Sequence, residues 1–301
     1  PSLPKKMVVI GGGYIGMEMG GVYQRLGTEV TVVEYMDQLL PAFASDLVRP
    51  VARRFKEAGG TILTSTKALG WDKWDGGGVA VRVEDRKAGE TKTLEADVIL
   101  VTTGRRPSVE GLGLEATGLT TDDGGFLKVD GAQRTDVDHI FAIGDVAGEP
   151  MLAHKATKEG EVAAEVIAGH PAAFDSRAVP AVVFTDPEIA TVGLSAKEAR
   201  AAGHVIKTGK FAFSANGRAL SLNDTDGFVR IVVDAHSSII LGMEAVGPEV
   251  SNLIAEIGLA IEMGAVASDV GMTIHAHPTL TEAVMEAANA AIGQAIHMVN
   301  R

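Results

Sequence analysis

Apolar and polar positions in the first third of the chain follow the pattern of a parallel sheet covered by helices. Continuous apolar runs predict buried strands at 6–11, 28–34, 61–65 and 97–104. Amphipathic stretches that end at glycine predict helices at 11–27 and 45–60. Alternating positions at 78–85 and 91–96 predict a β-hairpin before the last of these strands. Residues 1–106 are therefore predicted to form an α/β domain.

The pattern changes twice further along the chain. Residues 107–176 are rich in turns, with one clear strand at 139–145 and one helix at 155–169. From residue 177 onward, alternating strands and flanking helices predict an α+β domain that extends to residue 301. The strands are expected at 204–213, 227–234 and 238–246, and the helices at 249–263 and 278–298.

Composition narrows the class of protein. The 301 residues are 46% hydrophobic and 22% charged, which suits a globular protein of two or three domains. The formal net charge of −12 disfavours nucleic-acid binding. The chain has no cysteine, which excludes disulfides and cysteine-based zinc sites within it, and we predict no metal site. No apolar run is long enough to span a membrane, and no signal peptide is visible, so the cytoplasm is the expected location.

The first predicted strand-to-helix turn carries the glycine pattern G-x-G-x-x-G, formed by Gly11, Gly13 and Gly16. In this context the first glycine permits a tight turn, and the second lets a pyrophosphate approach the backbone. The third lets the helix pack closely on the strand. The N–H groups and the dipole at the helix N-terminus favour phosphate groups. A dinucleotide site in a Rossmann-type domain is predicted.

Glu34 indicates which dinucleotide binds. It ends the second predicted strand, 23 residues after Gly11. A carboxylate here accepts hydrogen bonds from the ribose hydroxyls of NAD and repels the 2′-phosphate of NADP. No arginine occurs in the next segment, 35–41, so NAD is favoured. The alternative is that the glycines only make a tight turn and that Glu34 is a solvated strand end.

Six further motifs accompany this fingerprint. They are TTGRRP (102–107), IFAIGDV (140–146), MLAHKA (151–156), FTDPEIATVGLS (184–195), FSANGRA (213–219) and HAHPTLTE (275–282). In this order they resemble the flavoprotein disulfide reductases, and among these the dihydrolipoamide dehydrogenase family, across nearly the whole chain. Phe184 stands where relatives often have tyrosine.

The resemblance implies three parts, namely an NAD-binding domain at 1–106, a central FAD-contacting segment at 107–176, and an interface domain for homodimerisation at 177–301. The NAD site would comprise Gly11, Gly12, Gly13, Tyr14, Ile15, Gly16, Glu18, Glu34, Ala68 and Gly104. The FAD contacts would be Asp145, binding ribitol, and the backbone at Met151, Leu152, Ala153 and His154.

HAHPTLTE carries the candidate chemistry. Pro278 suits the first position of the last predicted helix, with His277 just before it and Glu282 within it. A carboxylate on one ring nitrogen would fix the tautomer and leave the other nitrogen as a base. Alternatively, Thr279 and Glu282 form only a capping box, or His275 and His277 are part of a metal site. The resemblance implies a catalytic His277–Glu282 dyad, with His275 in a structural or supporting role.

Other motif residues have two interpretations each. Arg105 and Arg106 either hold the geometry on the flavin side or form ion pairs at a strand end. Asn216 and Arg218 either order the interface or make a turn.

One departure from the family is large. Relatives begin with an FAD-binding glycine motif and a C-x-x-x-x-C redox disulfide, and this sequence has neither. We therefore expect a fragment, inactive alone, rather than a chain whose missing half comes from another polypeptide. The resemblance implies that the intact enzyme oxidises dihydrolipoamide on the lipoyl domain of an acyltransferase (E2) component, in a 2-oxo-acid dehydrogenase complex. FAD would pass the electrons to NAD+. The alternatives are a non-catalytic NAD-binding and dimerisation module, a stand-alone NAD dehydrogenase, or a glutathione-reductase-like enzyme, which Glu34 disfavours.

Overall fold

The computed structural model describes residues 2–74 and 77–300, and their contacts divide the chain into two compact units. Unit 1 comprises the residues up to Gly104 and those from Pro180 onward, and unit 2 comprises Arg105–Val179. The predicted boundaries at 106 and 176 lie within a few residues of these limits. The three-part functional division remains a prediction.

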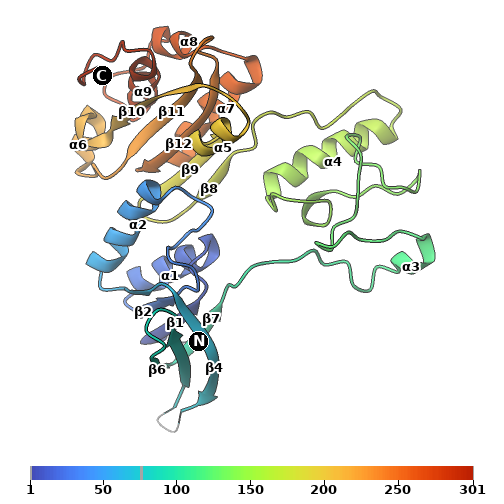
Figure 1. The fold of residues 1–301 in the computed structure, drawn as a ribbon, viewed down its shortest axis with the longest axis vertical. Helices are drawn as coiled ribbons and strands as arrows, with labels where there is room; N and C mark the ends of the chain where they lie inside the picture. The colour runs from blue at the N-terminus through green and yellow to red at the C-terminus, as the bar shows by residue number, and fades with distance from the viewer. Residues whose placement is uncertain (1, 75–76, 301) are drawn as a thin grey trace. The chain divides into compact units, whose positions relative to one another are not determined.

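A parallel sheet opens unit 1 (Figure 1). Its strand order is β3-β2-β1-β7, and its strands are β1 (Lys6–Ile10), β2 (Glu29–Val33), β3 (Thr61–Leu63) and β7 (Val98–Val101). The helices α1 (Tyr14–Arg25) and α2 (Ser45–Glu57) connect the first three strands. The apolar runs of the sequence predicted these elements, because strands buried on both faces are continuously apolar.

An antiparallel sheet of three strands is inserted before β7. It consists of β4 (Thr66–Lys73), β5 (Val79–Asp85) and β6 (Thr91–Ala96). The β5–β6 hairpin was predicted, whereas β4 was not. The positions of β4 that face inward are Thr66, Ala68 and Gly70, and its exposed positions include Leu69 and Trp71. The usual alternation of apolar and polar side chains is therefore inverted.

The C-terminal part of unit 1 is built on an antiparallel sheet in the order β10-β11-β12-β9-β8 (Figure 1). The strands are β8 (Ala181–Val183), β9 (Glu188–Gly193), β10 (Ile206–Ala212), β11 (Phe228–Asp234) and β12 (Ile240–Gly247). The helices are α5 (Ala196–Ala201), α6 (Gly217–Leu222), α7 (Val250–Met263), α8 (Ala267–Met272) and α9 (Glu282–Ala291). The predicted α+β class is confirmed.

The last predicted helix is much shorter than expected. It was predicted over 278–298, but α9 begins at Glu282 and ends at Ala291. Pro278 is therefore not its first residue, and the bond that precedes Pro278 is cis. Hydrogen bonds from side chains organise the residues between Pro278 and α9, and these compete with helical backbone bonds.

One apolar core joins the parallel sheet and its helices α1 and α2 to the C-terminal sheet. Met17 of α1 and Leu47 and Phe55 of α2 pack in one buried cluster with Ile189 of β9 and Phe228 of β11. Burial of this cluster holds the parallel sheet and the C-terminal sheet in one body.

Unit 2 contains α3 (Leu114–Thr117), the short 3₁₀ helix η1 (Gly144–Val146) and α4 (Ala153–Ile167). A small core that includes Leu119, Leu127 and Ala142 supports them. The strand predicted at 139–145 is wrong, because the segment makes only an isolated bridge between Arg134 and Phe141. Its backbone bonds instead go to turns, so no continuous ladder forms.

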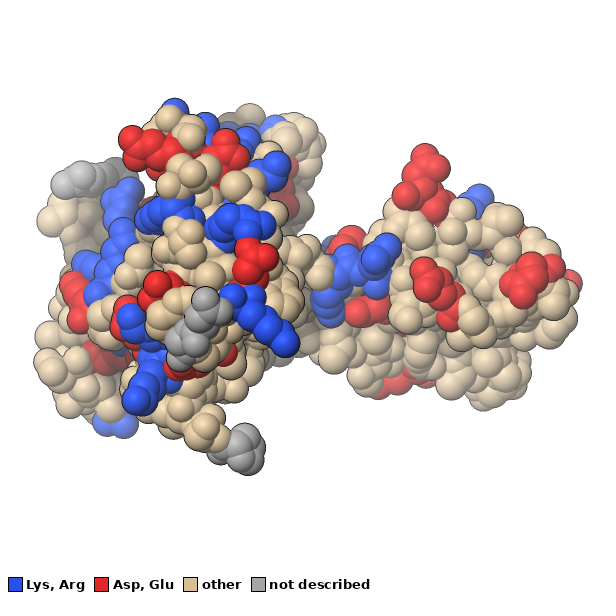
Figure 2. All heavy atoms as spheres, turned by 90° about the horizontal axis from the view of Figure 1, so that it is seen from below, with Lys and Arg blue, Asp and Glu red and all other residues tan. Residues whose placement is uncertain are grey.

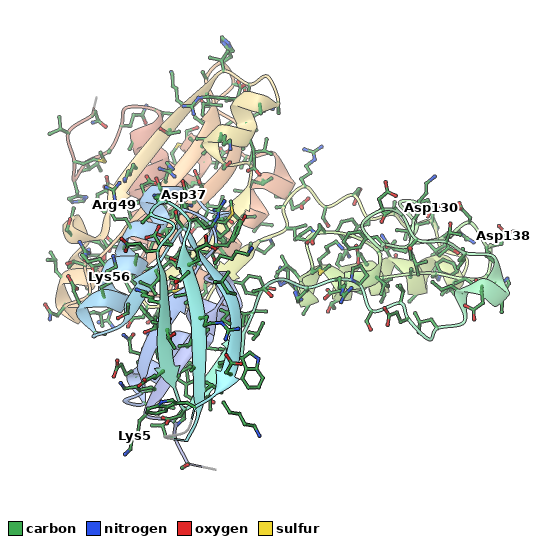
Figure 3. The ribbon with its side chains drawn as sticks, turned by 60° about the horizontal axis from the view of Figure 1, so that its bottom comes forward. Lys5, Asp37, Arg49, Lys56, Asp130 and Asp138 are labelled. Atoms are coloured by element: carbon green, nitrogen blue, oxygen red, sulfur yellow. The ribbon has the colours of Figure 1, made fainter. Side chains whose placement is uncertain are left out.

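Basic and acidic side chains are interspersed among uncharged residues on the face shown in Figure 2. Lys5, Lys56 and Asp138 are exposed and point away from the ribbon (Figure 3). Among the described residues, none of the helices has the length and apolar character that crossing a bilayer requires.

Arg230 of β11 lies at the junction between the two parts of unit 1. Its guanidinium donates to Asp46 of α2 at 2.6 Å and to Glu244 of β12 at 3.0 Å. The Glu244 side chain is only 5% exposed. Burial alone would raise the pKa of Asp46, but the hydrogen bond and charge of Arg230, with the charge of Lys210, outweigh it and lower that pKa.

Arg230→Met is expected to lower the free energy of unfolding by about 3–5 kcal/mol, because the buried Glu244 carboxylate loses its cationic partner. Urea denaturation at neutral pH measures the change. Lys210→Met is the matched control, since Lys210 lies 3.7 Å from Asp46 and is half exposed, and we expect a cost of about 1 kcal/mol or less. Equal effects of the two substitutions would contradict the role of Arg230 as the cationic partner of the buried Glu244.

The ion pair between Arg230 and Asp46 predicts that stability depends on pH. A carboxyl group whose pKa is lowered by folding stabilises the protein above its unfolded value of about 3.9, and this contribution is lost as the pH falls through the folded value. The wild-type chain should therefore lose stability below about pH 4 more steeply than Arg230→Met. Parallel slopes of unfolding free energy against pH would contradict this expectation.

Candidate active site

The glycine turn between β1 and α1 has a different constraint at each position. Gly11 has a φ of +106°, and a Cβ atom there would lie 2.7 Å from the Thr102 carbonyl oxygen. A Cβ atom on Gly16 would overlap the carbonyl oxygen of Gly11. By contrast, a Cβ atom on Gly13 would meet no protein atom within 4 Å. Packing thus requires Gly11 and Gly16, whereas the space beside Gly13 is open to a ligand.

Glu34 is buried and fixed by backbone donors. Its Oε2 accepts from the Gly12 N–H at 2.6 Å, and its Oε1 accepts from the Met36 N–H at 2.7 Å. Each carboxylate oxygen can accept a second hydrogen bond. The side chain therefore holds the glycine turn against the end of β2 and retains the capacity to accept from a sugar hydroxyl.

An open groove runs along the carboxyl ends of the parallel strands. Its lining includes five of the residues predicted for the NAD site, Gly11, Gly13, Glu34, Ala68 and Gly104. It also includes residues that the sequence did not identify, Tyr35, Pro41, Thr66 and Lys67. A groove at this edge of an open α/β sheet is the usual position for a dinucleotide. The open space at Gly13 and the acceptor at Glu34 both fit an NAD molecule.

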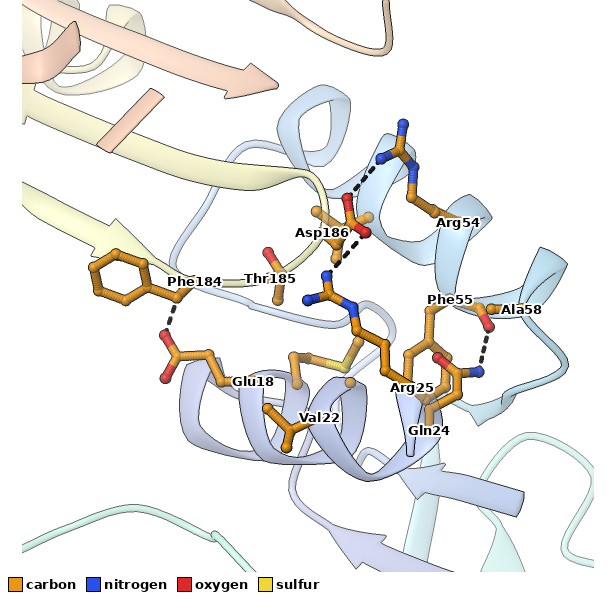
Figure 4. Close-up of a pocket in the computed structure, with 13 residues that line it drawn as sticks. Glu18, Val22, Gln24, Arg25, Arg54, Phe55, Ala58, Phe184, Thr185 and Asp186 are labelled. Carbon is orange, nitrogen blue, oxygen red and sulfur yellow. Dashed lines mark hydrogen bonds and ion pairs between the residues drawn. The ribbon is translucent and has the colours of Figure 1, made fainter. Parts of the chain in front are cut away.

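Of the remaining predicted NAD residues, Gly12 lies in the glycine turn and the other four lie on α1. Tyr14 and Ile15 begin the helix. The Glu18 side chain accepts from the Phe184 N–H at 2.8 Å, beside a different pocket between α1, α2 and the turn before β9 (Figure 4). In that pocket Arg25 and Arg54 both form ion pairs with Asp186. The structure therefore does not place Glu18 among the residues that line the glycine-turn groove.

Unit 2 holds the residues predicted to contact FAD. Asp145 lies in η1 with its side chain 46% exposed, and Arg105 donates to it at 3.1 Å and to the Met151 carbonyl oxygen. Leu152 is the N-cap of α4, so Ala153 and His154 are in its first turn. An exposed carboxylate near backbone N–H groups of a first helical turn fits the hydroxyl and carbonyl groups of a flavin nucleotide. Arg105 therefore forms an ion pair, and because its partner is Asp145, the pair agrees with both interpretations of this arginine.

A buried ion pair that the sequence analysis did not identify supports Asp145. Lys155 and Glu159 are both nearly inaccessible, and their charged groups lie 2.8 Å apart. The other oxygen of Glu159 accepts from the Gly144 N–H at 2.7 Å, and Lys155 donates to the Gly148 carbonyl oxygen. The i,i+4 spacing of lysine and glutamate in 155–159 was the available signal, but the same spacing also occurs on exposed helix faces.

His277 and Glu282 meet as the sequence suggested. His277 Nδ1 lies 2.9 Å from Glu282 Oε1, and the ring is 76% exposed. Glu282 Oε2 accepts from the Thr279 N–H at 2.9 Å. The proposed dyad and half of the proposed capping box therefore coexist, one on each oxygen. Burial would raise the pKa of Glu282, but the bonds from Thr279 and His277 outweigh it and lower that pKa.

Two side chains hold the loop that carries His277. The His275 side chain is only 5% exposed, and its ring nitrogens contact Glu256 Oε1 at 3.0 Å and the Thr273 carbonyl oxygen at 2.8 Å. Asn216 caps α6 and donates to the Thr279 carbonyl oxygen at 3.0 Å. His275 is therefore supporting, and Asn216 both makes its turn and orders the loop. No metal-binding group of three or more ligands occurs among the described residues.

Two models of known protein families match this chain. The family model described as pyridine nucleotide-disulphide oxidoreductase matches residues 1–160, and the model of the dimerisation domain of the same family matches residues 179–288. The chain belongs to the pyridine nucleotide-disulphide oxidoreductase family. The resemblance inferred from the motifs is confirmed, and FAD and NAD are the cofactors associated with this family and its dihydrolipoyl dehydrogenase members.

Curated relatives in this family are dihydrolipoyl dehydrogenases. The chain is 53% identical to that of Halobacterium salinarum over 299 residues and 48% identical to that of Geobacillus stearothermophilus over 299 residues. Each alignment covers 99% of this chain and 63% of the relative. The chain therefore spans less than two thirds of the length of these oxidoreductases.

Solved structures of the family have the same fold. LpdA from Mycobacterium tuberculosis matches with a TM-score of 0.87 and 31% identity, over 96% of this chain and 62% of that one. The HOCl-induced flavoprotein disulfide reductase RclA from Escherichia coli matches with a TM-score of 0.86 and 26% identity, over 96% of this chain and 65% of that one. The predicted Rossmann-type domain followed by an α+β domain is thus the oxidoreductase fold.

Substitutions at two glycines separate packing from ligand approach. Gly13→Ala should leave the free energy of unfolding within about 0.5 kcal/mol of wild type, because its Cβ atom meets open space. Gly16→Ala should lower it by about 1–3 kcal/mol, because its Cβ atom overlaps the Gly11 carbonyl oxygen. Chemical denaturation measures both values, and NADH titration should show weakened binding for Gly13→Ala. Normal NADH affinity in that variant would reject the groove as the pyrophosphate path.

Proposed function

We propose that this chain forms the NAD-binding, FAD-contacting and dimer-forming part of a dihydrolipoyl dehydrogenase. The observation that carries the proposal is the His277–Glu282 pair, with Nδ1 of the histidine on the carboxylate and the ring otherwise exposed. It occurs in one chain with the glycine-turn groove and the Asp145 turn. Relatives of about 50% identity named dihydrolipoyl dehydrogenase support the reaction class.

The geometry of the dyad suits thiol chemistry. The Glu282 carboxylate holds Nδ1, so a proton on Nδ1 leaves Nε2 as the acceptor. Nε2 then takes the proton of a substrate thiol of dihydrolipoamide and generates the thiolate, which is the reactive form in disulfide exchange. FAD, when bound, supplies the two-electron transfer from the dithiol to NAD+.

The cofactor assignments follow the residues described above. Gly11–Gly16 and Glu34 would hold the pyrophosphate and ribose of NAD, and Ala68 and Gly104 would line its groove. Asp145 would bind the ribitol of FAD, with Lys155 and Glu159 fixing its turn. The first turn of α4 at 153–154 would lie against the flavin.

The partners we propose are a second copy of the chain and a lipoyl domain of an E2 component. The dimerisation-domain match supports the first. Large apolar side chains are also exposed on and after α7 and α8, namely Leu259, Met263, Met272 and Ile274. Such a group of exposed apolar side chains is typical of an interaction surface. We place the enzyme in the cytoplasm.

A second candidate is that the 301 residues act as an NAD-binding and dimerising module without catalysis of their own. The absence of cysteine from the sequence favours it, since the chain by itself offers no thiol for exchange with lipoamide. Size measurement by light scattering and NADH titration of the chain test this module directly. Detectable dihydrolipoamide oxidation by the purified 301-residue chain would reject it.

His277→Gln should lower dihydrolipoamide oxidation by about 100-fold or more, because general-base catalysis contributes a factor of this order. The enzyme for the assay is a longer polypeptide in which this chain follows the N-terminal region of the Geobacillus stearothermophilus relative. NADH oxidation by ferricyanide is the internal control, since this reaction needs no thiol deprotonation and should be unchanged. Equal loss of both activities would indicate misfolding, and loss of neither would reject the base assignment.

A further inference from the structure

Arg86, in the turn after β5, reaches the end of β2 next to Glu34. Its Nη1 donates to the Tyr35 carbonyl oxygen at 2.9 Å. That carbonyl belongs to the same peptide unit as the Met36 N–H, which donates to Glu34 at 2.7 Å. One peptide plane therefore lies between a guanidinium and a carboxylate, with its C=O toward the cation and its N–H toward the anion.

The same arginine also contacts the side chain of Tyr35. The guanidinium carbon lies 3.8 Å from the centre of the Tyr35 ring, which is cation–π distance. Tyr35 lines the glycine-turn groove, whereas Arg86 is not among the groove-lining residues. Arg86 thus supports a groove residue from outside the groove.

Backbone bonds fix the turn that carries Arg86. The Arg86 N–H donates to the Ser65 carbonyl oxygen at 2.8 Å, and the Ser65 N–H donates to the Met36 carbonyl oxygen. The Thr66 N–H donates to the Glu34 carbonyl oxygen at 2.9 Å. Backbone N–H groups of Ser65 and Thr66 therefore hold the carbonyl groups of Met36 and Glu34, and the Arg86 side chain holds the carbonyl group between them.

We propose that Arg86 is a positioning residue for the adenosine half of the dinucleotide, acting through Tyr35 and Glu34. It holds the Tyr35 ring as a wall of the groove and aligns the 35–36 peptide, whose N–H orients the Glu34 carboxylate. The inference rests on the proposed NAD site and assigns a residue that the glycine fingerprint does not include. Its effect is confined to ligands that carry the adenosine half.

The test measures ligand affinity of the 301-residue chain by calorimetric titration with NADH and with ADP-ribose. Arg86→Gln should weaken both by the same factor, about five- to tenfold, from one exposed cation–π contact and one charge-assisted hydrogen bond. Glu34→Gln should weaken both as well. The double variant should bind more tightly than the product of the two single effects predicts, because both act on one peptide unit.

Lys87→Gln is the matched control, since it removes the same charge from the adjacent position of the same turn. The affinity of Lys87→Gln for both ligands should stay within about twofold of wild type, because the attraction between an exposed charge and the ligand phosphates is screened by salt. An equal loss in Lys87→Gln and Arg86→Gln would overturn the proposal in favour of a general charge effect. Additive effects of Arg86→Gln and Glu34→Gln would overturn the coupling through the peptide.

Failure of the underlying site gives a different result. If the wild-type chain binds neither NADH nor ADP-ribose, the proposed NAD site is wrong. If the wild type and Lys87→Gln bind normally and Arg86→Gln binds within twofold of them, the NAD site stands and the role of Arg86 is rejected. Thermal unfolding of Arg86→Gln confirms that the comparison is between folded proteins.

Discussion

The candidate sites depend on hydrogen bonds from backbone N–H groups to glutamates with little or partial exposure. Glu34 accepts from Gly12 and Met36, Glu159 accepts from Gly144, and Glu282 accepts from Thr279. An ionised carboxylate accepts strong hydrogen bonds and fixes the position of each donor. These bonds hold the turns in place although the turns belong to no α-helix or strand. Such support is needed where backbone groups face a ligand and cannot pair with a neighbouring strand.

Each of these glutamates has a second interaction that matches its site. Glu159 pairs with a buried lysine, whose charge compensates that of the carboxylate, and its other oxygen positions Gly144. Glu282 uses one oxygen for the Thr279 N–H and the other for His277, so it ties the position of the imidazole ring to that of the loop. Glu34 uses both oxygens on backbone donors and keeps acceptor capacity for a sugar hydroxyl. In the proposed function, glutamate therefore has three roles: Glu159 is structural, Glu282 supports the base, and Glu34 binds a ligand.

The sequence predicted features that arise from local pattern and missed those that arise from distant contacts. The strands of the parallel sheet and the glycine turn were evident because period and spacing encode them. Strand β4 was missed because its inward positions are small and its outward positions include Leu69 and Trp71. The pairing of His277 with Glu282 was predicted, but Pro278 was assigned to a helix that begins four residues later. The bond from Asn216 to Thr279 joins residues 63 positions apart, and no local pattern encodes it.

The high exposure of His277 indicates that this chain alone does not enclose the proposed site. The proposed base has 76% of its side chain exposed and lies in a high dielectric, where electrostatic and hydrogen-bonding contributions to catalysis are weakest. The loop beneath it is firmly held, since His275 is buried and Asn216 bonds to Thr279. A rigid loop that presents an exposed ring is suited to insertion into another surface. The fully exposed Ile274, three residues before His277, supports the same conclusion, because burial of both would follow from one contact. The arrangement therefore favours a catalytic centre that is completed by a second polypeptide surface, in accord with the proposed dimer.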